Sequence, residues 1–199
     1  QALAYIVDTN KIAQAAMGAY GKPCYSDYGA AQKVYIDNKE WVDKNLNTYS
    51  FSIANANKAL DKSDYKDERD GKTPFDAKKA SKDYLRYNSK GEVLLISHLG
   101  SEKNTITDNI KLQLTKNAPQ VGIKYEITVK DFETMLNIYY QKQKAEVKYN
   151  VYNMASGFNE VPDPEADYHG KYEKVANFNP YGLNDAELNK AIENLKASK

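Results

Sequence analysis

The sequence predicts an α/β fold: a single lobe with a mixed, mainly parallel sheet flanked by helices. From residue 92 onward, strand-like and helix-like segments alternate, which is typical of parallel strands joined by crossover helices. The chain has 199 residues and shows no internal repeat or linker, so residues 1–199 are predicted to form one domain with its own core. The composition, 41% hydrophobic and 28% charged, is that of an ordinary globular domain.

The first half of the chain is predicted to consist of helices separated by loops. Residues 2–18 carry an apolar stripe of helical spacing, and Asp8 can restart the helix inside it. Residues 20–41 contain glycines, a proline and many tyrosines without a period, which indicates an extended loop. Residues 52–62 are predicted to form a short helix, and the polar stretch 65–82 indicates turns.

The strand and helix signals become clearer from residue 84. Residues 84–98 are predicted to form a β-hairpin, with its turn at 88–91 and His98 at the end of its second strand. Residues 104–117 have apolar side chains spaced by four, which predicts a helix. Residues 121–129 alternate strictly between apolar and polar side chains, as a half-buried strand does.

Three further elements complete the prediction. Asp131 can cap a helix whose apolar residues recur at i, i+3, i+4 and i+7. Residues 147–154 are predicted to form a strand. The last helix spans residues 183–196, and its start carries a capping-box spacing with Asn184 as the N-cap and Glu187 three positions later.

Charge and composition exclude several classes of protein. The 28 basic and 27 acidic residues leave a net charge of +1, which argues against a nucleic-acid partner. No apolar run approaches the roughly 18–20 residues that span a bilayer. The single Cys24 excludes an internal disulfide. We expect a monomer that uses no cofactor and has no metal site.

Catalytic motifs are missing from the sequence. It contains no nucleophile elbow, no Ser-x-x-Lys with its supporting boxes and no phosphate-binding glycine loop. Pairing of Cys24 with a histidine, as in a cysteine hydrolase, has no family signature to support it. The sequence therefore favours a binding module over an enzyme.

An acidic run follows the last predicted strand. Asp163, Glu165, Asp167 and His169 alternate through a predicted loop, and hard cations prefer clustered carboxylates. The run lacks the EF-hand spacing, so a solvated acidic loop is the favoured interpretation and a cation site is the alternative.

Five segments follow one another in the order and spacing of a known family. The segments are residues 1–12 with the turn Tyr20-Gly21-Lys22-Pro23, residues 57–71, residues 112–132, residues 147–164 and residues 178–188. Together they cover nearly the whole chain and resemble extracellular solute-binding protein family 5, the oligopeptide- and dipeptide-binding proteins of ABC transporters. Each segment alone is a weak signal, and the five together are fairly specific.

The resemblance implies a two-lobed protein of which this chain is the second, smaller lobe, of the periplasmic-binding-protein-like type II class. The first lobe, the signal peptide and the lipid-anchored cysteine are then expected outside this chain. The implied function is to capture a short peptide between the lobes and deliver it to an ABC permease in the membrane. The implied location is the outer face of the plasma membrane, as a lipoprotein, or the periplasm. The alternatives are a non-transport cell-surface interaction module and a carrier of nickel, haem or a sugar.

In the family, the loop after the strand that matches residues 147–154 carries an aromatic residue and commonly an acid that holds the amino terminus of the ligand. Here Ser156 replaces the family's Trp, and Val161 replaces its first Asp. By position, Glu160 is the nearest replacement acid and Asp163 the next. Phe158 is the candidate replacement for the aromatic residue.

A second loop, residues 98–104, is implied to face the same cleft. Free N–H groups at the start of the helix near Asn104 would suit an anionic part of the ligand. The candidate ligand-binding residues are Asn153, Ser156, Gly157, Phe158, Asn159, Glu160, Asp163, His98, Ser101 and Asn104.

Overall fold

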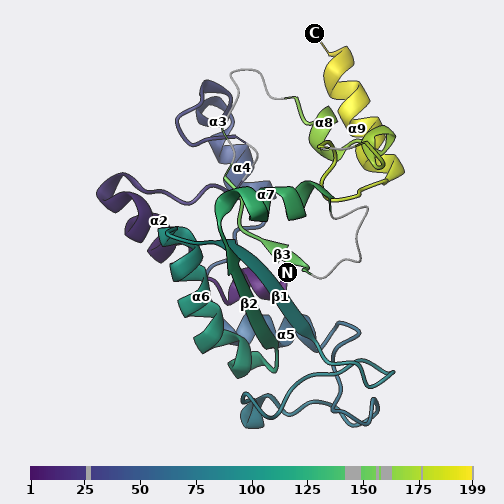
Figure 1. The fold of residues 1–199 in the computed structure, drawn as a ribbon. Coiled ribbons are helices and arrows are strands. Elements are labelled where there is room, and N and C mark those ends of the chain that lie inside the picture. The colour runs from purple at the N-terminus through teal and green to yellow at the C-terminus, as the bar shows by residue number, and fades with distance from the viewer. Residues whose placement is uncertain (26–27, 142–148, 156, 158–162, 176, 199) are drawn as a thin grey trace.

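A parallel sheet lies at the centre of the molecule (Figure 1). The computed structural model describes residues 1–25, 28–141, 149–155, 157, 163–175 and 177–198. Within these residues the sheet has three strands in the order β2-β1-β3. The strands are β1 (Leu95–Ser101), β2 (Lys124–Lys130) and β3 (Val151–Tyr152), and both neighbours of β1 run parallel to it. The predicted α/β class with a mainly parallel sheet is confirmed.

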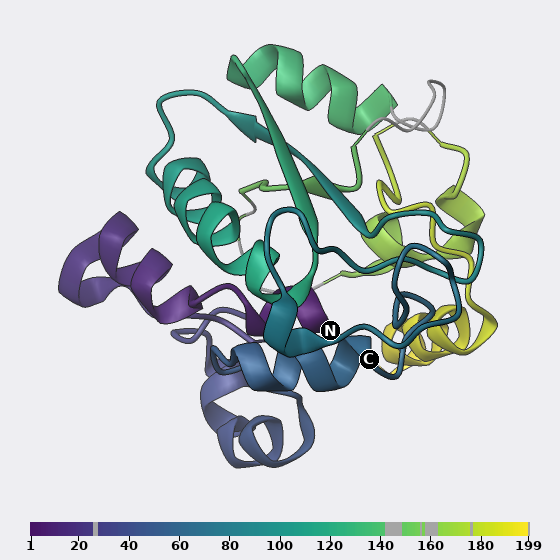
Figure 2. The same ribbon diagram turned by 90° about the horizontal axis from the view of Figure 1, so that it is seen from below.

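Two helices connect the strands and cover opposite faces of the sheet (Figure 2). Helix α6 (Thr105–Asn117) joins β1 to β2, and α7 (Phe132–Gln141) precedes β3. Along β1, Ile96 packs into the core on the α6 side, whereas Leu99 packs against Met135 of α7. Side chains alternate between the faces of a strand, so His98 shares the α6 side with Ile96.

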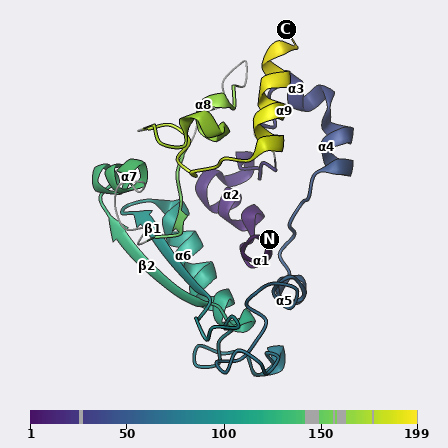
Figure 3. The same ribbon diagram turned by 90° about the vertical axis from the view of Figure 1, so that its right-hand side faces the viewer.

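The larger core lies on the α6 side of the sheet, where the N-terminal helices pack (Figure 3). Helices α1 (Ala2–Tyr5) and α5 (Ile53–Leu60) contribute to it together with α6 and the 3-10 turn η3 (Ala118–Val121). The fully or nearly fully buried side chains of this core are Ile6, Ala56, Leu60, Leu114, Ala118, Val121 and Ile123. The predicted helix break at Asp8 is confirmed, because its carboxylate accepts from the Lys11 amide and starts α2 (Thr9–Met17).

The prediction of a loop over residues 20–41 is wrong in part. Besides the short 3-10 turn η1 (Gly18–Tyr20), the segment contains α3 (Lys33–Asp37) and the start of α4 (Lys39–Asn45). Both helices carry a lysine–aspartate ion pair at i, i+4, and such pairs support a helix without an apolar stripe. In the polar stretch 65–82, all residues are described, and the helical element there is the short 3-10 turn η2 (Ala77–Lys79). This agrees with the predicted turns.

The predicted hairpin over residues 84–98 is reduced to one antiparallel bridge, between Tyr87 and Val93. The edges of β1 have other partners: β2 pairs with it along its whole length, and β3 pairs with it on the opposite side. On that second side, Asn150 extends the pairing, because its side-chain oxygen accepts from the Ser97 amide and its Nδ2 donates to the Leu95 carbonyl. The second arm of the hairpin therefore belongs to the parallel sheet.

The C-terminal part contains α8 (Glu165–Tyr168), η4 (Gly170–Tyr172) and α9 (Ala186–Ala197). The predicted last helix is present, but its N-cap is Asp185, whose carboxylate accepts from the Leu188 amide at 2.8 Å. Asn184 was predicted for this role; its side-chain amide instead donates to Glu173 at 3.0 Å. The predicted strand 147–154 is observed only as β3, and residues 147 and 148 lie outside the described residues.

Candidate ligand-binding site

His98 lies in the middle of the central strand, not at its end as the sequence predicted. The strand continues to Ser101, and the His98 side chain is fully buried, with 0% of its surface exposed. Its Nδ1 is 2.8 Å from the Tyr125 hydroxyl, and its Nε2 is 2.8 Å from Oδ1 of Asn153. The histidine thus joins β2 to the residue that follows β3.

The hydrogen bonds assign the tautomer of His98. An amide oxygen can only accept, so Nε2 carries the proton and donates to Asn153, while Nδ1 accepts from the Tyr125 hydroxyl. Burial lowers the pKa of His98 below its ordinary value and raises the pKa of Tyr125 to about 12. The pair is therefore neutral at physiological pH.

Asn153 also joins β3 to helix α6. Its Nδ2 donates to Oγ1 of Thr107 at 3.0 Å, and that hydroxyl lies 3.2 Å from Asn153 Oδ1, where it can donate in return. The neighbouring Gly100 permits this approach, because a Cβ there would lie 2.5 Å from the Thr107 methyl group. No sequence pattern points to Thr107, and the alternation of residues 121–129 identifies Tyr125 only as a member of the apolar face of its strand.

The loop between β1 and α6 is held by Asn104. Its Nδ2 donates to Ser101 Oγ at 2.8 Å, and its Oδ1 accepts from the amides of Ile106 and Thr107 at 2.9 and 3.2 Å. Lys103 between them has a left-handed backbone, with φ of 52°. The sequence predicts free N–H groups at this helix start that would suit an anion. In the structure, Asn104 caps the amides of Ile106 and Thr107.

The structure brings some of the predicted ligand residues together at the carboxyl end of β1 and beside it. Those brought together are His98, Ser101, Asn104 and Asn153. Those outside the described residues are Ser156, Phe158, Asn159 and Glu160. Gly157 and Asp163 are exposed, and the Asp163 carboxylate accepts from the Glu165 amide at 3.0 Å. Contact of any of these residues with a ligand stays a prediction.

The acidic run is not a simple loop, because α8 begins at Glu165 and its carboxylate pairs with Lys171 and Lys196. His169 accepts from the Lys171 amide through Nδ1 at 3.1 Å, and its Nε2 is 3.2 Å from Oε1 of Glu193. Within the part of the chain that the structure describes, no group of three or more His, Cys, Asp or Glu residues is placed to hold a metal ion.

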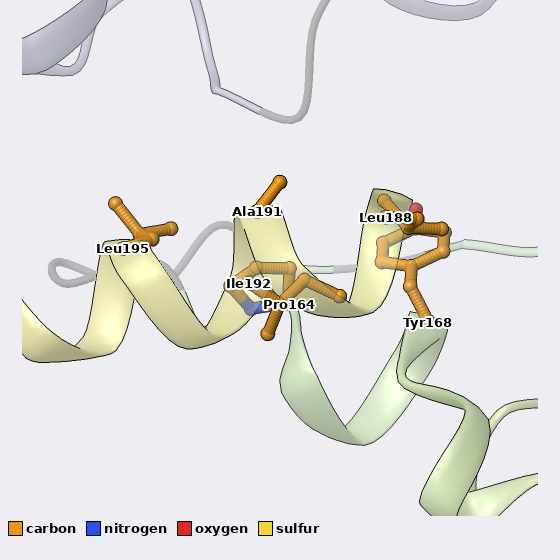
Figure 4. A pocket seen from close by; sticks show the side chains of 6 residues that line it. All are labelled: Pro164, Tyr168, Leu188, Ala191, Ile192 and Leu195. Atoms are coloured by element: carbon orange, nitrogen blue, oxygen red, sulfur yellow. The ribbon is translucent and has the colours of Figure 1, made fainter. Parts of the chain in front are cut away.

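Several surface hollows are lined by residues other than the predicted ligand residues. The hollow in Figure 4, of about 550 Å³, lies between the α8 segment and α9. Its lining residues are Pro164, Tyr168, Leu188, Ala191, Ile192 and Leu195. Ligand sites combine an apolar lining with a few placed polar groups. The lining of this hollow is mainly apolar, whereas the polar side chains of the predicted site cluster at the carboxyl end of β1.

Two observations concern a Cys24 hydrolase and a membrane-spanning helix. Cys24 is exposed, and its thiol lies 2.8 Å from the Tyr28 carbonyl, while both histidines hydrogen-bond to residues other than the cysteine. Among the described helices, none combines the length and the apolar character needed to cross a membrane.

Comparisons with known proteins place the fold. No family model and no curated protein matches the chain. A mannohexaose-bound periplasmic oligopeptide-binding protein of an ABC transporter from Thermotoga maritima superposes with a TM-score of 0.73 at 17% identity, over 100% of this chain and 35% of that one. The oligopeptide-binding protein AppA from Bacillus subtilis, in complex with a nonapeptide, gives 0.67 at 11% identity, over 100% and 35%.

A third structure, NikA from Staphylococcus aureus in complex with Ni(L-His)2, gives a TM-score of 0.60 at 18% identity, over 97% of this chain and 34% of that one. The chain thus spans about a third of the length of each of these structures. At these identities the likeness is one of fold, and it confirms the fold that the sequence resemblance implied. The chain is built as a single α/β lobe of the kind found in the family 5 solute-binding proteins of ABC transporters.

Proposed function

We propose that this chain is the second lobe of a two-lobed substrate-binding protein of an ABC importer, and that it is not an enzyme. The observation that carries the proposal is the match of the entire chain to part of an oligopeptide-binding protein that holds a nonapeptide. The carboxyl end of a parallel sheet is where open α/β folds bind ligands. That end of β1 carries the polar cluster around Asn104 and Asn153.

The proposed ligand is a short peptide held in extended form between the lobes. Backbone hydrogen bonding makes such binding tolerant of sequence, and the charged ends of the peptide need partners once closure removes them from water. Two loops are proposed to contact it: the loop 101–104 and the loop that follows β3. In the second loop, Glu160 is the proposed partner of the peptide amine, and Asp163 is the next candidate.

The partner of the whole protein is proposed to be an ABC permease, to which hinge closure presents the loaded form. The proposed location is the outer face of the plasma membrane, as a lipoprotein, or the periplasm. The protein is proposed to act as a monomer. In this account Cys24 has no chemical role, so Cys24→Ala leaves both folding and ligand binding unchanged; loss of a hydrolytic activity in that variant would favour the cysteine-hydrolase alternative.

Two specific observations favour two further candidate ligands. NikA, with the same fold over 97% of this chain, is in complex with Ni(L-His)2, and the Thermotoga protein holds mannohexaose. Calorimetric titration of the natural protein that carries this chain, with a nonapeptide, with Ni²⁺ plus L-histidine and with mannohexaose, separates these ligands. We expect heat of binding with the nonapeptide; binding of only one of the other two probes would replace the peptide assignment.

The amine-binding residue is tested in the same protein. Glu160→Gln should weaken nonapeptide binding by about 1.5–3 kcal/mol, the strength of a hydrogen bond to a charged group. Asp163→Asn is the matched control and should change the affinity much less. An unchanged affinity in Glu160→Gln, with a loss in Asp163→Asn, would move the role to Asp163.

A further inference from the structure

The polar network at the centre of the sheet joins β1 and β2 to the residue that follows β3 and to a crossover helix. It runs from Tyr125 in β2 through His98 in β1 to Asn153 after β3, and from there to Thr107 in the first turn of α6. His98 and Thr107 are fully buried, with 0% of their surface exposed. Such groups are costly to bury unless they are hydrogen-bonded, and here each of them is.

The network determines the orientation of Asn153. The Nε2–H of His98 and the hydroxyl of Thr107 both approach its side-chain oxygen, and its Nδ2 donates back to Thr107. In the tautomer assigned above, Nδ1 accepts from the Tyr125 hydroxyl and Nε2 donates to the Asn153 oxygen. In this arrangement both the oxygen and the nitrogen of the Asn153 side-chain amide have hydrogen-bond partners.

Asn153 is the residue at which the chain leaves β3. The strand ends at Tyr152, and the loop proposed to contact the ligand begins directly after it. The bonds of the Asn153 side chain therefore hold the start of that loop against α6, whose N-terminal turn follows the other proposed loop.

We propose that His98 and Thr107 are positioning residues, which act through Asn153 to set the ligand-contacting loop after β3 rather than by touching the ligand. His98 is fully buried, and its side chain bonds Asn153 on one side and Tyr125 on the other. The inference rests on the proposed function, and it assigns His98 a different role from the direct contact that the sequence suggested. Sites held by a locked supporting layer bind more tightly than sites on loops that are free to move.

The test compares variants that break the network on different sides of Asn153. His98→Leu removes the donor to Asn153, whereas Tyr125→Phe removes only the bond on the far side of the imidazole. Thr107→Val removes the hydroxyl at constant shape, whereas Thr107→Ser keeps it. The Thr107 pair keeps the proposal testable even where His98→Leu fails to fold.

Two quantities are measured. The first is hydrogen exchange, by NMR, of the Asn153 side-chain amide and the Met154 backbone amide. The second is the affinity of the natural protein for a nonapeptide by calorimetry. We expect faster exchange and a loss of affinity of about tenfold in His98→Leu and Thr107→Val, because each loses a buried hydrogen bond. Tyr125→Phe and Thr107→Ser should stay within about twofold of the natural affinity.

The proposal is overturned if Asn153 exchanges equally slowly in His98→Leu and Thr107→Val. It is also overturned if nonapeptide affinity falls in all four variants in proportion to their loss of stability, as a purely structural role requires. If the natural protein binds no nonapeptide, Ni²⁺ with L-histidine or mannohexaose, the proposed function fails, and the exchange of Asn153 still decides the positioning claim.

Discussion

Arg86 Nη2 lies 2.7 Å from Asp61 Oδ1, and the two side chains differ sharply in exposure, 0% for Arg86 and 54% for Asp61. Arg86 also donates from Nε to the Val121 carbonyl at 3.0 Å and from Nη2 to Asn57 Oδ1 at 3.0 Å. Its guanidinium carbon is 4.2 Å from the centre of the Phe75 ring. One buried guanidinium thus ties the long loop before β1 to α5 and η3.

Arg86→Met should lower the free energy of unfolding by about 3 kcal/mol, because it leaves the Val121 carbonyl and Asn57 without their buried donor. Arg69→Met is the matched control at an exposed position and should stay within about 0.5 kcal/mol. Urea unfolding followed by circular dichroism measures both. Equal stability of the two variants would show that the Arg86 contacts contribute nothing net.

Gly122 is required where η3 meets β2. Its φ is 73°, and a Cβ there would lie 2.6 Å from Phe75 Cζ and 2.8 Å from Arg86 Cγ. Gly182 has a similar φ of 63° but no atom within 4 Å of the same position. Both Gly→Ala variants therefore share the backbone cost of about 1–2 kcal/mol, and only Gly122→Ala adds overpacking of about 1–3 kcal/mol. Thermal unfolding that gives equal losses would contradict this packing.

Glu165 makes the C-terminal part sensitive to acid. Hydrogen bonds from Lys171 and Lys196 lower the pKa of its carboxyl to about 2. A group whose pKa is lower in the folded state stabilises the fold above its ordinary pKa, near 4.5, and loses that contribution as pH falls toward 2. The stabilisation from Glu165 should therefore be complete at pH 7 and disappear between about pH 5 and pH 2.

The matched variant is Glu165→Gln, which carries no charge at any pH. Its melting temperature should lie below that of the natural sequence at pH 7 and converge with it at pH 2. Glu187→Gln, at an exposed position in the first turn of α9, is the control. A gap between the natural sequence and Glu165→Gln that persists unchanged at pH 2 would show that the ion pairs do not cause the difference.

The parallel sheet was predictable because its signals are local. The strict alternation of residues 121–129 and the i, i+4 spacing of residues 104–117 follow from burial on one face, so periodicity identifies them. The Ser52 cap of α5 and the Asp8 cap of α2 are equally local, since each side chain bonds an amide three residues on.

What could not be predicted depends on contacts between distant segments. Asn153 bonds His98 and Thr107, which are 55 and 46 residues away, and no periodicity reports such a pairing. The sequence predicts a strand end at His98, but the ladder with β2 extends β1 to Ser101. The sequence does not distinguish Asp185 from Asn184 as the N-cap, because both residue types are good caps. The hydrogen bond from the Asn184 side chain to Glu173 depends on a distant contact.

The most direct test of the account is native mass spectrometry of the natural protein that carries this chain, purified without denaturation. We expect a series of bound masses that match short peptides and are released when the protein is unfolded. A single metal or sugar adduct would contradict the peptide assignment. A bare protein whose melting temperature does not shift with a peptide mixture would contradict the binding function itself.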